Sequence, residues 1–302
     1  MNTQPWSLKE MNQAVCAIEG KVVHTPLTWH RGVALKREDR QAGGTSKWRG
    51  VQAEISMSRI SPPGIVCVSS GNTGKAVALA ARIRGIEAHM FCTEDSMLQK
   101  REYVESLGAR IHVSKSSFSE ASSKASEFAA DRGFLFISPG ASWPFAYGAA
   151  SIVPEIIRNA PSVSLIVAPI GGGGLISGIG LALSACRPRA PRLVGVQAAN
   201  SPYYYNEFHG ISGPVRAVST VADCISGDLE RRAIIRSIAR NFIDDILLVE
   251  ELEIIGATKE LEAMGIMVEP GAAVGYAAIQ TARFRRSWDG HRVCVIVSGG
   301  RA

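Results

Sequence analysis

Short runs rich in Val and Ile alternate with longer amphipathic stretches along almost the whole of this 302-residue chain. The runs have the length and composition of buried strands, and most are bounded by Gly, Pro or Ser. The stretches between them have the length and apolar spacing of helices. A strand–helix–strand order of this kind predicts an α/β fold, with a mostly parallel sheet covered by helices on both faces.

The apolar runs are predicted as strands at Ile65–Val68, Ala88–Cys92, Arg110–Val113, Phe134–Ile137, Leu165–Ala168, Leu193–Gln197, Ile246–Val249 and Val293–Val297. The helices predicted between them are Gly74–Arg84, Met97–Leu107, Ser119–Arg132, Ala149–Asn159, Leu175–Cys186, Glu230–Asn241, Glu251–Met264 and Ala272–Arg283. An open parallel sheet binds ligands at the carboxyl ends of its strands. The turns that follow the strands are therefore where functional residues are expected.

Composition indicates a folded protein outside the membrane. Hydrophobic residues make up 46% and charged residues 20%, which excludes a disordered chain. The net charge of +6 is spread along the sequence, so no nucleic-acid partner is expected. The start lacks the apolar core of a signal peptide, and no stretch approaches the ~20 apolar residues of a membrane span. A cytoplasmic protein with no membrane partner is predicted.

The cysteines and histidines show no metal-binding or disulfide pattern. No two of the six cysteines form a CxxC pair, and several lie inside apolar runs, so buried free thiols are predicted. The six histidines are scattered without HExxH spacing, so no zinc site is predicted.

The turn after the first predicted strand is rich in small polar residues. It reads Ser69-Ser70-Gly71-Asn72-Thr73 and leads into the next predicted helix. Free N–H groups at a helix N-terminus, together with hydroxyl and amide side chains, can bind a carboxylate or phosphate. Helix capping alone would need one polar residue, so the length of this run favours anion binding.

Four consecutive glycines, Gly171–Gly174, follow another predicted strand and lead into a helix at Leu175. Backbone without side chains can approach a ligand closely, and successive N–H groups can bind a phosphate. A tight turn needs one or two glycines, so a phosphate site is favoured over a structural turn. A dinucleotide site would have an acid at the end of the next strand, where Gln197 stands, and a P-loop would have GK[ST] after the glycines. Both nucleotide interpretations are weakened.

Two further segments supply an amine and a hydroxyl group. Lys47 lies in GGTSKWRG, before an amphipathic stretch, and by position alone it would be a surface charge. Beside a phosphate site, however, an amine can form a Schiff base with a phosphate-bearing aldehyde such as pyridoxal 5'-phosphate (PLP). Ser298 ends the last predicted strand at the carboxyl edge of the sheet, which by itself is weak evidence.

In their order along the chain, these segments resemble the PLP enzymes of the tryptophan synthase β-like fold, called fold type II, and above all the serine/threonine dehydratase branch. GGTSKWRG is similar to the family's Ser-Phe-Lys-x-Arg-Gly element, SSGNTG to its substrate-carboxylate loop and GGGGLISG to its phosphate loop. VEPGAAVGYAAI and VIVSGG resemble its two C-terminal elements, and the early HTPL fits as well. The resemblance covers Val22 to Gly300.

The resemblance implies two open, mostly parallel α/β/α domains with the cofactor in the cleft between them. Residues 1–36 and 146–302 would form a large PLP-binding domain, and residues 37–145 a small mobile substrate domain. Enzymes of this architecture are commonly dimers, so a homodimer is expected. The expected partner is a small amino-acid substrate.

The resemblance also implies roles for individual residues. Lys47 would bind PLP as a Schiff base and later act as acid and base at the substrate's Cα. Asn72 would hydrogen-bond to the ring hydroxyl O3′, Ser298 would face the pyridine nitrogen, and Glu269 lies in the element that lines the far side of the ring. The phosphate would be bound by the backbone of Gly171, Gly172, Gly173, Gly174 and Leu175. The substrate would be bound by Ser69, Ser70, Gly71, Asn72 and Thr73, of which Ser70 would also be catalytic.

The reaction implied is a PLP-dependent β-elimination, the ammonia-lyase (dehydratase) reaction, on a serine- or threonine-like amino acid through an aminoacrylate. The alternative is β-replacement, as in cysteine synthase or diaminopropionate synthase, or a threonine synthase-like reaction. Gln197 stands where dehydratases of this branch usually have an acid that serves a divalent cation, so no metal is predicted there. Thr73 matches the cysteine-synthase-like branch. The sequence leaves the substrate and leaving group open.

Two hypotheses from other classes remain at this point. A non-catalytic protein could keep the fold to sense an amino acid or PLP, but pure binding has no need of the Lys47 amine. A nicotinamide-dependent dehydrogenase is disfavoured by Gln197.

Overall fold

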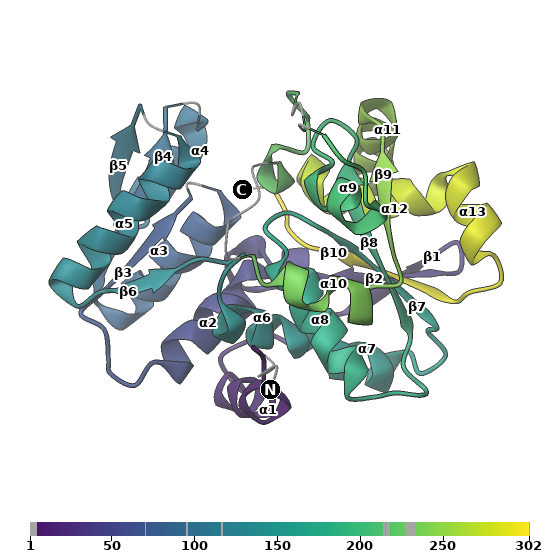
Figure 1. Ribbon diagram of the computed structural model, residues 1–302, viewed down its shortest axis with the longest axis horizontal. Coiled ribbons are helices and arrows are strands. Elements are labelled where there is room, and N and C mark those ends of the chain that lie inside the picture. The colour runs from purple at the N-terminus through teal and green to yellow at the C-terminus, as the bar shows by residue number, and fades with distance from the viewer. Residues whose placement is uncertain are drawn as a thin grey trace.

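Two separate sheets form the framework of the protein, and helices cover both faces of each (Figure 1). The computed structural model describes residues 5–69, 71–94, 96–115, 117–213, 215, 218–226 and 233–301. One sheet has six strands and the other has four, and nearly all neighbouring strands are parallel. The predicted α/β fold is therefore confirmed.

The six-stranded sheet has the order β1-β2-β10-β7-β8-β9, and only its edge pair β1–β2 is antiparallel. Its strands are β1 (Leu27–His30), β2 (Val33–Arg37), β10 (Val293–Val297), β7 (Leu165–Pro169), β8 (Arg192–Ala198) and β9 (Asp245–Val249). The strands β10, β7 and β8 are buried on both faces, which explains their continuous apolar sequences.

Helices on the two faces of this sheet enclose two separate apolar cores. One core is covered by α1 (Leu8–Ala17), α6 (Trp143–Ala150), α7 (Ile152–Asn159), α8 (Gly174–Ser184), α9 (Tyr203–His209) and α10 (Ile235–Phe242). The other is covered by α11 (Glu251–Ala263), α12 (Pro270–Gln280) and α13 (Ala282–Trp288).

The four-stranded sheet is inserted between β2 and β7 and has the all-parallel order β5-β4-β3-β6. Its strands are β3 (Gly64–Val68), β4 (Glu87–Thr93), β5 (Arg110–Ser114) and β6 (Leu135–Ile137). One face packs on α2 (Lys47–Met57), α3 (Asn72–Arg84) and α4 (Leu98–Ser106), and the other packs on α5 (Phe118–Arg132). The predicted domain boundaries, at residues 36/37 and 145/146, stay a prediction.

The segment before Lys47 and the last residues of the chain meet between the two sheets, where Figure 1 marks the C-terminus. Thr45 bridges to Gly299, and the amide of Ser46 donates to the carbonyl of Ser298 at 2.9 Å. Gly300 in turn donates to the carbonyl of Gly44 at 2.9 Å. Two segments far apart in sequence are thereby fixed side by side at the junction of the sheets.

All eight predicted strands are present, with bounds that differ by one residue at most at each end. The helix predicted at Ala149–Asn159 is wrong as a single element, because α6 ends at Ala150 and α7 begins at Ile152. The helix predicted at Ala272–Arg283 is likewise broken at Thr281, whose extended backbone separates α12 from α13. The start predicted at Glu230 lies outside the described residues, and α10 begins at Ile235.

The cysteines are only partly as predicted. Cys67, Cys92 and Cys294 are buried and free, whereas Cys16 and Cys186 are exposed. The prediction that the thiols are buried is therefore wrong for these two. Among the described residues, no helix combines the length and apolar character required to cross a bilayer.

Glu54, on α2, is a carboxyl group inside the protein with an incomplete hydrogen-bond environment. The residue is 7% exposed, and its Oε1 atom has no hydrogen-bond partner among the described residues. Burial raises the pKa of Glu54 from an ordinary value of 4.5 to about 7.

This raised pKa predicts a loss of stability between about pH 5 and pH 7. In that interval the unfolded chain has released a proton that the folded chain retains, so the free energy of unfolding falls as the pH rises. The shift from 4.5 to about 7 corresponds to about 3 kcal/mol, fully developed by pH 8. Urea unfolding of the wild type and of Glu54→Gln at several pH values measures it. The variant should gain stability relative to the wild type across this interval; a difference that does not change with pH would contradict the assignment.

Candidate active site

A cavity of about 460 Å³ lies between the two sheets, at the carboxyl ends of their strands. Lys47, Asn72 and Gly171, each from a different predicted motif, line it. Ser69, Gly71, Thr73 and Gly172 line the same cavity. The structure therefore brings the amine, the polar turn after β3 and the glycine turn after β7 to one place, where the carboxyl ends of strands from the two sheets face one cavity.

Lys47 is the first residue of α2, and its position is set by the C-terminal segment of the chain. Its backbone N–H donates to the hydroxyl of Thr45 at 3.3 Å, and Thr45 itself bridges to Gly299. Burial lowers the pKa of the Lys47 amine, and the nearby Cys224 and Glu269 only partly oppose this effect. A larger fraction of the amine is thus neutral near pH 7, which is the form that attacks an aldehyde.

The polar turn after β3 contains a buried side-chain oxygen without a hydrogen-bond partner among the described residues. Asn72 opens α3, and its Oδ1 atom is buried without a hydrogen-bond partner among the described residues. Ser69 orders the turn by accepting from the amide of Gly71 at 3.1 Å. Gly74 must be glycine here, because an added Cβ would lie 2.3 Å from the carbonyl oxygen of Ser69. Ser70, predicted as catalytic, lies outside the described residues.

The four glycines after β7 divide into two pairs. Gly171 and Gly172 line the cavity with their backbone. Gly173 has a φ of +90°, and a Cβ on Gly174 would lie 2.1 Å from the carbonyl oxygen of Pro139, so both are needed for the turn into α8. Leu175 follows with its side chain in the core of the six-stranded sheet. Packing therefore explains the second pair of glycines. At the first pair the approach is less close, since an added Cβ would lie 3.2 Å from Cα of Ile225 at Gly171 and 3.4 Å from Cα of Gly140 at Gly172.

Two C-terminal motifs converge on Asn72. Ser298 directly follows β10, and Glu269 is the residue before α12. A Cβ added to Gly299 would lie 2.9 Å from Nδ2 of Asn72 and 3.5 Å from Oε1 of Glu269. Glycine at position 299 thus leaves room for the Asn72 amide, whereas Glu269 would remain at an ordinary contact distance.

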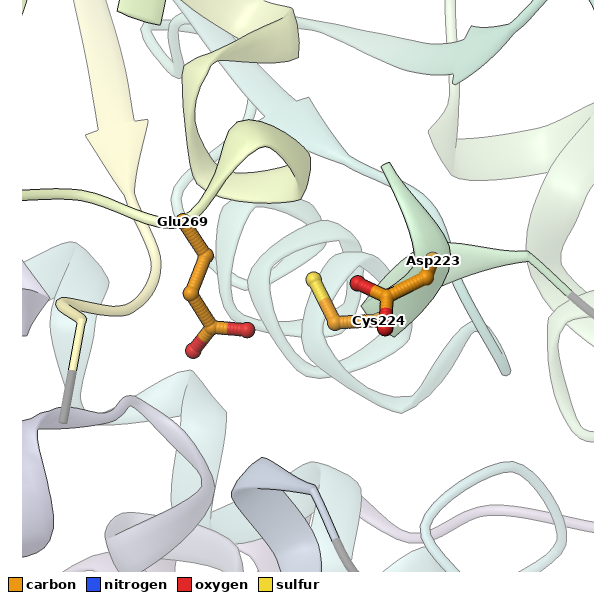
Figure 2. Close-up of side chains that lie close together, drawn as sticks. All are labelled: Asp223, Cys224 and Glu269. Atoms are coloured by element: carbon orange, nitrogen blue, oxygen red, sulfur yellow. The ribbon is translucent and has the colours of Figure 1, made fainter. Parts of the chain in front are cut away.

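The sequence analysis missed Asp223 and Cys224, which lie in a short 3₁₀ helix, η3 (Asp223–Ile225). Figure 2 shows both side chains with that of Glu269, and the possible ligand atoms of the three residues lie within 4.8 Å of one another. Lys100 of α4 donates to Asp223, and burial raises the pKa of the Cys224 thiol, so this thiol stays protonated near neutral pH. Asp223 and Cys224 line the cavity that contains Lys47.

Gln197, the residue at which no metal was predicted, takes part in a hydrogen bond within the fold. Gln197 is 2% exposed, and its side-chain oxygen accepts a hydrogen bond from the amide of Tyr205 at 2.9 Å.

Lys100 and Asp223 connect the two halves of the cavity, since α4 packs on the four-stranded sheet and η3 contacts α12 of the other. Both side chains are partly exposed, at 29% and 38%, so the pair should contribute on the order of 1 kcal/mol.

Lys100→Met and Asp223→Asn are each expected to reduce kcat/KM by about fivefold, because either change removes the same contact across the cavity. The double variant should be no worse than the worse single one. Steady-state kinetics of the four proteins measures the coupling; additive losses would show that the two side chains act independently.

The residues around this cavity suit PLP. An amine with a lowered pKa, a backbone turn without side chains and an unpaired amide oxygen at Asn72 all face or adjoin it. A family model described as pyridoxal-phosphate dependent enzyme matches residues 18–299, nearly the whole chain. The chain belongs to this family. It is thus a PLP-dependent enzyme of fold type II, and its cofactor is pyridoxal 5'-phosphate.

Its relatives include enzymes with more than one activity. L-threonine ammonia-lyase of Thermotoga maritima is 31% identical over 276 residues, which cover 89% of this chain and 67% of the relative. A catabolic L-threonine dehydratase of Staphylococcus aureus is 29% identical, covering 97% of this chain and 88% of the relative. The structure of maize serine racemase superimposes with a TM-score of 0.88 at 27% identity, covering 98% of this chain and 94% of that one. This PLP enzyme is thus related both to dehydratases and to racemases of hydroxy amino acids.

Proposed function

We propose that this chain is an ammonia-lyase that eliminates the β-substituent of a serine- or threonine-like amino acid and releases ammonia and a keto acid. The observation that carries the proposal is the position of Lys47, an amine of lowered pKa, in one cavity with the Ser69–Thr73 turn and the glycine turn. Threonine dehydratases among the relatives support the lyase over other fold type II reactions.

The cofactor would be held from several sides. Lys47 would bind its aldehyde, Asn72 its ring hydroxyl, and the backbone from Gly171 to Leu175 its phosphate. Ser298 would meet the pyridine nitrogen, and a neutral hydroxyl there does not enforce protonation of the ring. The chemistry supplied by bound PLP is the withdrawal of electrons from the substrate's Cα.

The protein's own groups would bind the substrate and move the proton. Ser69, Ser70 and Thr73 would hold the substrate carboxylate at the start of α3, where free N–H groups favour an anion. The Lys47 amine, displaced by the substrate's amino group, would remove the proton from Cα as a positioned general base. Departure of the β-hydroxyl then completes the elimination, and water afterwards releases ammonia.

Incubation of the PLP-loaded protein with L-serine, L-threonine and their O-acetyl and O-phospho derivatives tests the proposal. We expect ammonia and keto acid in equal amounts from at least one of them. Formation of the D-amino acid without ammonia would identify a racemase. A product that forms only when sulfide or an amine nucleophile is added would identify β-replacement, the alternative that Thr73 favours. A homodimer and a cytoplasmic location also stay predictions; light scattering of the purified protein tests the former.

A further inference from the structure

Part of the lining of the cavity that contains Lys47 is mainly apolar and lies beside the first turns of α5. Val68, Phe91 and Phe136 line this part from the four-stranded sheet, and Phe118 and Ser122 line it from α5. We refer to the space between these five residues as the α5 lobe. No motif of the sequence analysis includes any of them.

Strand register makes the wall of the α5 lobe continuous. Val68 is the Cα partner of Phe91, and Phe136 is the partner of Val66, two residues before Val68. Side chains two residues apart on a strand point to the same face, so all of these lie on the face covered by α5. Val66 and Phe91 pack there against Ala125 and Ala129 of that helix.

Along α5, the side chain that leaves the lobe open is Ser122. Phe118 and Ser122 are four residues apart and therefore share one side of the helix. Phe118 is 41% exposed, whereas Ser122 is half-buried and lines the cavity with a small side chain. One turn further on, Ala125 is fully buried against the sheet and the core closes.

The α5 lobe has no evident use for a serine or threonine side chain. Val68 directly precedes Ser69, so the apolar wall begins one residue from the turn expected to hold the substrate carboxylate. A hydroxymethyl group has almost no apolar surface to bury against a wall that includes aromatic rings. With such a substrate bound, the apolar wall would stay in contact with water, which is unfavourable. Ligand sites are typically apolar pockets with a few polar groups that fix orientation, which is the arrangement here.

We propose that the α5 lobe binds an apolar, aryl-sized group on Cβ of the substrate, so that the preferred substrates are β-hydroxy amino acids larger than threonine. This inference rests on the proposed lyase function and specifies its substrate class. In the reaction the Cα–H bond and the Cβ–O bond break, a Cα–Cβ double bond forms, and water leaves. Addition of water then releases ammonia and a 2-oxo acid that retains the apolar group, so no oxidant or reductant is needed.

The first test compares L-threo-β-phenylserine with L-serine. We expect kcat/KM of the wild-type holoenzyme to be at least about 10-fold higher for phenylserine, because burial of even one methylene in such a pocket changes it by about that factor. Ser122→Leu fills the α5 lobe and should lower kcat/KM for phenylserine at least about 10-fold more than for serine. Ser123→Leu, on the exposed side of the same turn, is the matched control and should not change this ratio. Equal losses on both substrates in Ser122→Leu would overturn the proposal.

The second test is independent of the elimination. L-phenylalanine and L-alanine have no β-leaving group, and their binding would be followed by the change we expect in the visible spectrum of the holoenzyme when the substrate amine displaces Lys47. We expect phenylalanine to bind at least about 10-fold more tightly, and Ser122→Leu but not Ser123→Leu to remove the difference. If no hydroxy amino acid is eliminated but phenylalanine is still preferred, the proposed lyase function is wrong and the proposal that the α5 lobe binds an apolar group is supported. If alanine binds as tightly as phenylalanine, the α5 lobe is only a packing defect.

Discussion

Lys47→Ala is expected to lower the turnover of any amino-acid substrate by at least about 10³-fold and to abolish the visible absorbance of protein-bound PLP. The amine is both the group that would hold the cofactor and the group that would move the Cα proton, so one substitution removes two functions. Absorbance spectra and steady-state rates of the purified variant, after incubation with PLP, measure the two losses. Circular dichroism establishes that the variant is folded.

Three further variants identify the role of this particular amine. Lys47→Arg keeps the positive charge but cannot form a Schiff base, so its spectrum should match that of Lys47→Ala. Lys75, which is 8% exposed and has a pKa lowered by burial, and Lys100 are the other amines near Glu269. Lys75→Ala and Lys100→Met should keep the absorbance band. Loss of the band in either of these, with retention in Lys47→Ala, would move the cofactor's attachment to another lysine.

The second large effect concerns a buried cluster of charged residues that includes Arg49 in the first turn of α2. Arg49 of α2 donates to Glu38 at 2.8 and 2.9 Å and to Glu155 of α7 at 2.7 Å. Lys36 of β2 also donates to Glu155, and the side chains of all four residues are at most 5% exposed. The cluster joins α2, which begins with Lys47, to the six-stranded sheet and its helices.

Arg49→Ala is expected to lower the free energy of unfolding by about 3–5 kcal/mol, because it leaves Glu38 and Glu155 buried with too few partners. Arg110→Ala is the control, since Arg110 forms an ion pair with Glu87 in which the side chains are 70% and 50% exposed. That substitution should cost no more than about 1 kcal/mol. Urea unfolding measures both; a loss below about 1 kcal/mol in Arg49→Ala would mean that the cluster relaxes or admits water.

Periodicity was sufficient to predict the eight strands from β3 to β10, because most of them have the continuous apolar sequences of buried strands. The β1–β2 hairpin was missed because its short strands, LTWH and VALKR, lack such a run. Its turn depends on positive φ values at Arg31 and Gly32, of which only the glycine is an obvious sign in the sequence.

The break between α6 and α7 has a tertiary cause. Ser151 stands between the two helices, donates to the carbonyl of Gly148 at 2.7 Å and accepts from Arg49 at 2.9 Å. A local pattern of helix formers cannot show that a residue 102 positions away requires a hydrogen-bond acceptor at this point.

Some of the functional residues could be predicted from the sequence, and others could not. Asn72 and Gly171 lie in compact motifs that follow predicted strands, so a functional role for these turns could be predicted from the fold class. No strand was predicted before Lys47, so its place beside them followed only from the family resemblance. Asp223, Cys224 and Lys100 lie in no recognisable motif, and only the packing of η3 and α4 at the cavity brings them there. The α5 lobe could not be predicted from the sequence for a related reason. Its wall depends on the register of neighbouring strands and on the small size of Ser122.

The most direct test of the account is to reduce the PLP-loaded wild-type protein with borohydride and to locate the modified residue by peptide mass spectrometry. Reduction makes the bond between cofactor and lysine permanent, so the attachment site can be read from the peptide masses. We predict a single pyridoxyl group, on the peptide that contains Lys47. Modification of a different lysine, or a protein that remains unmodified at saturating PLP, would contradict the assignment of this cavity as the active site.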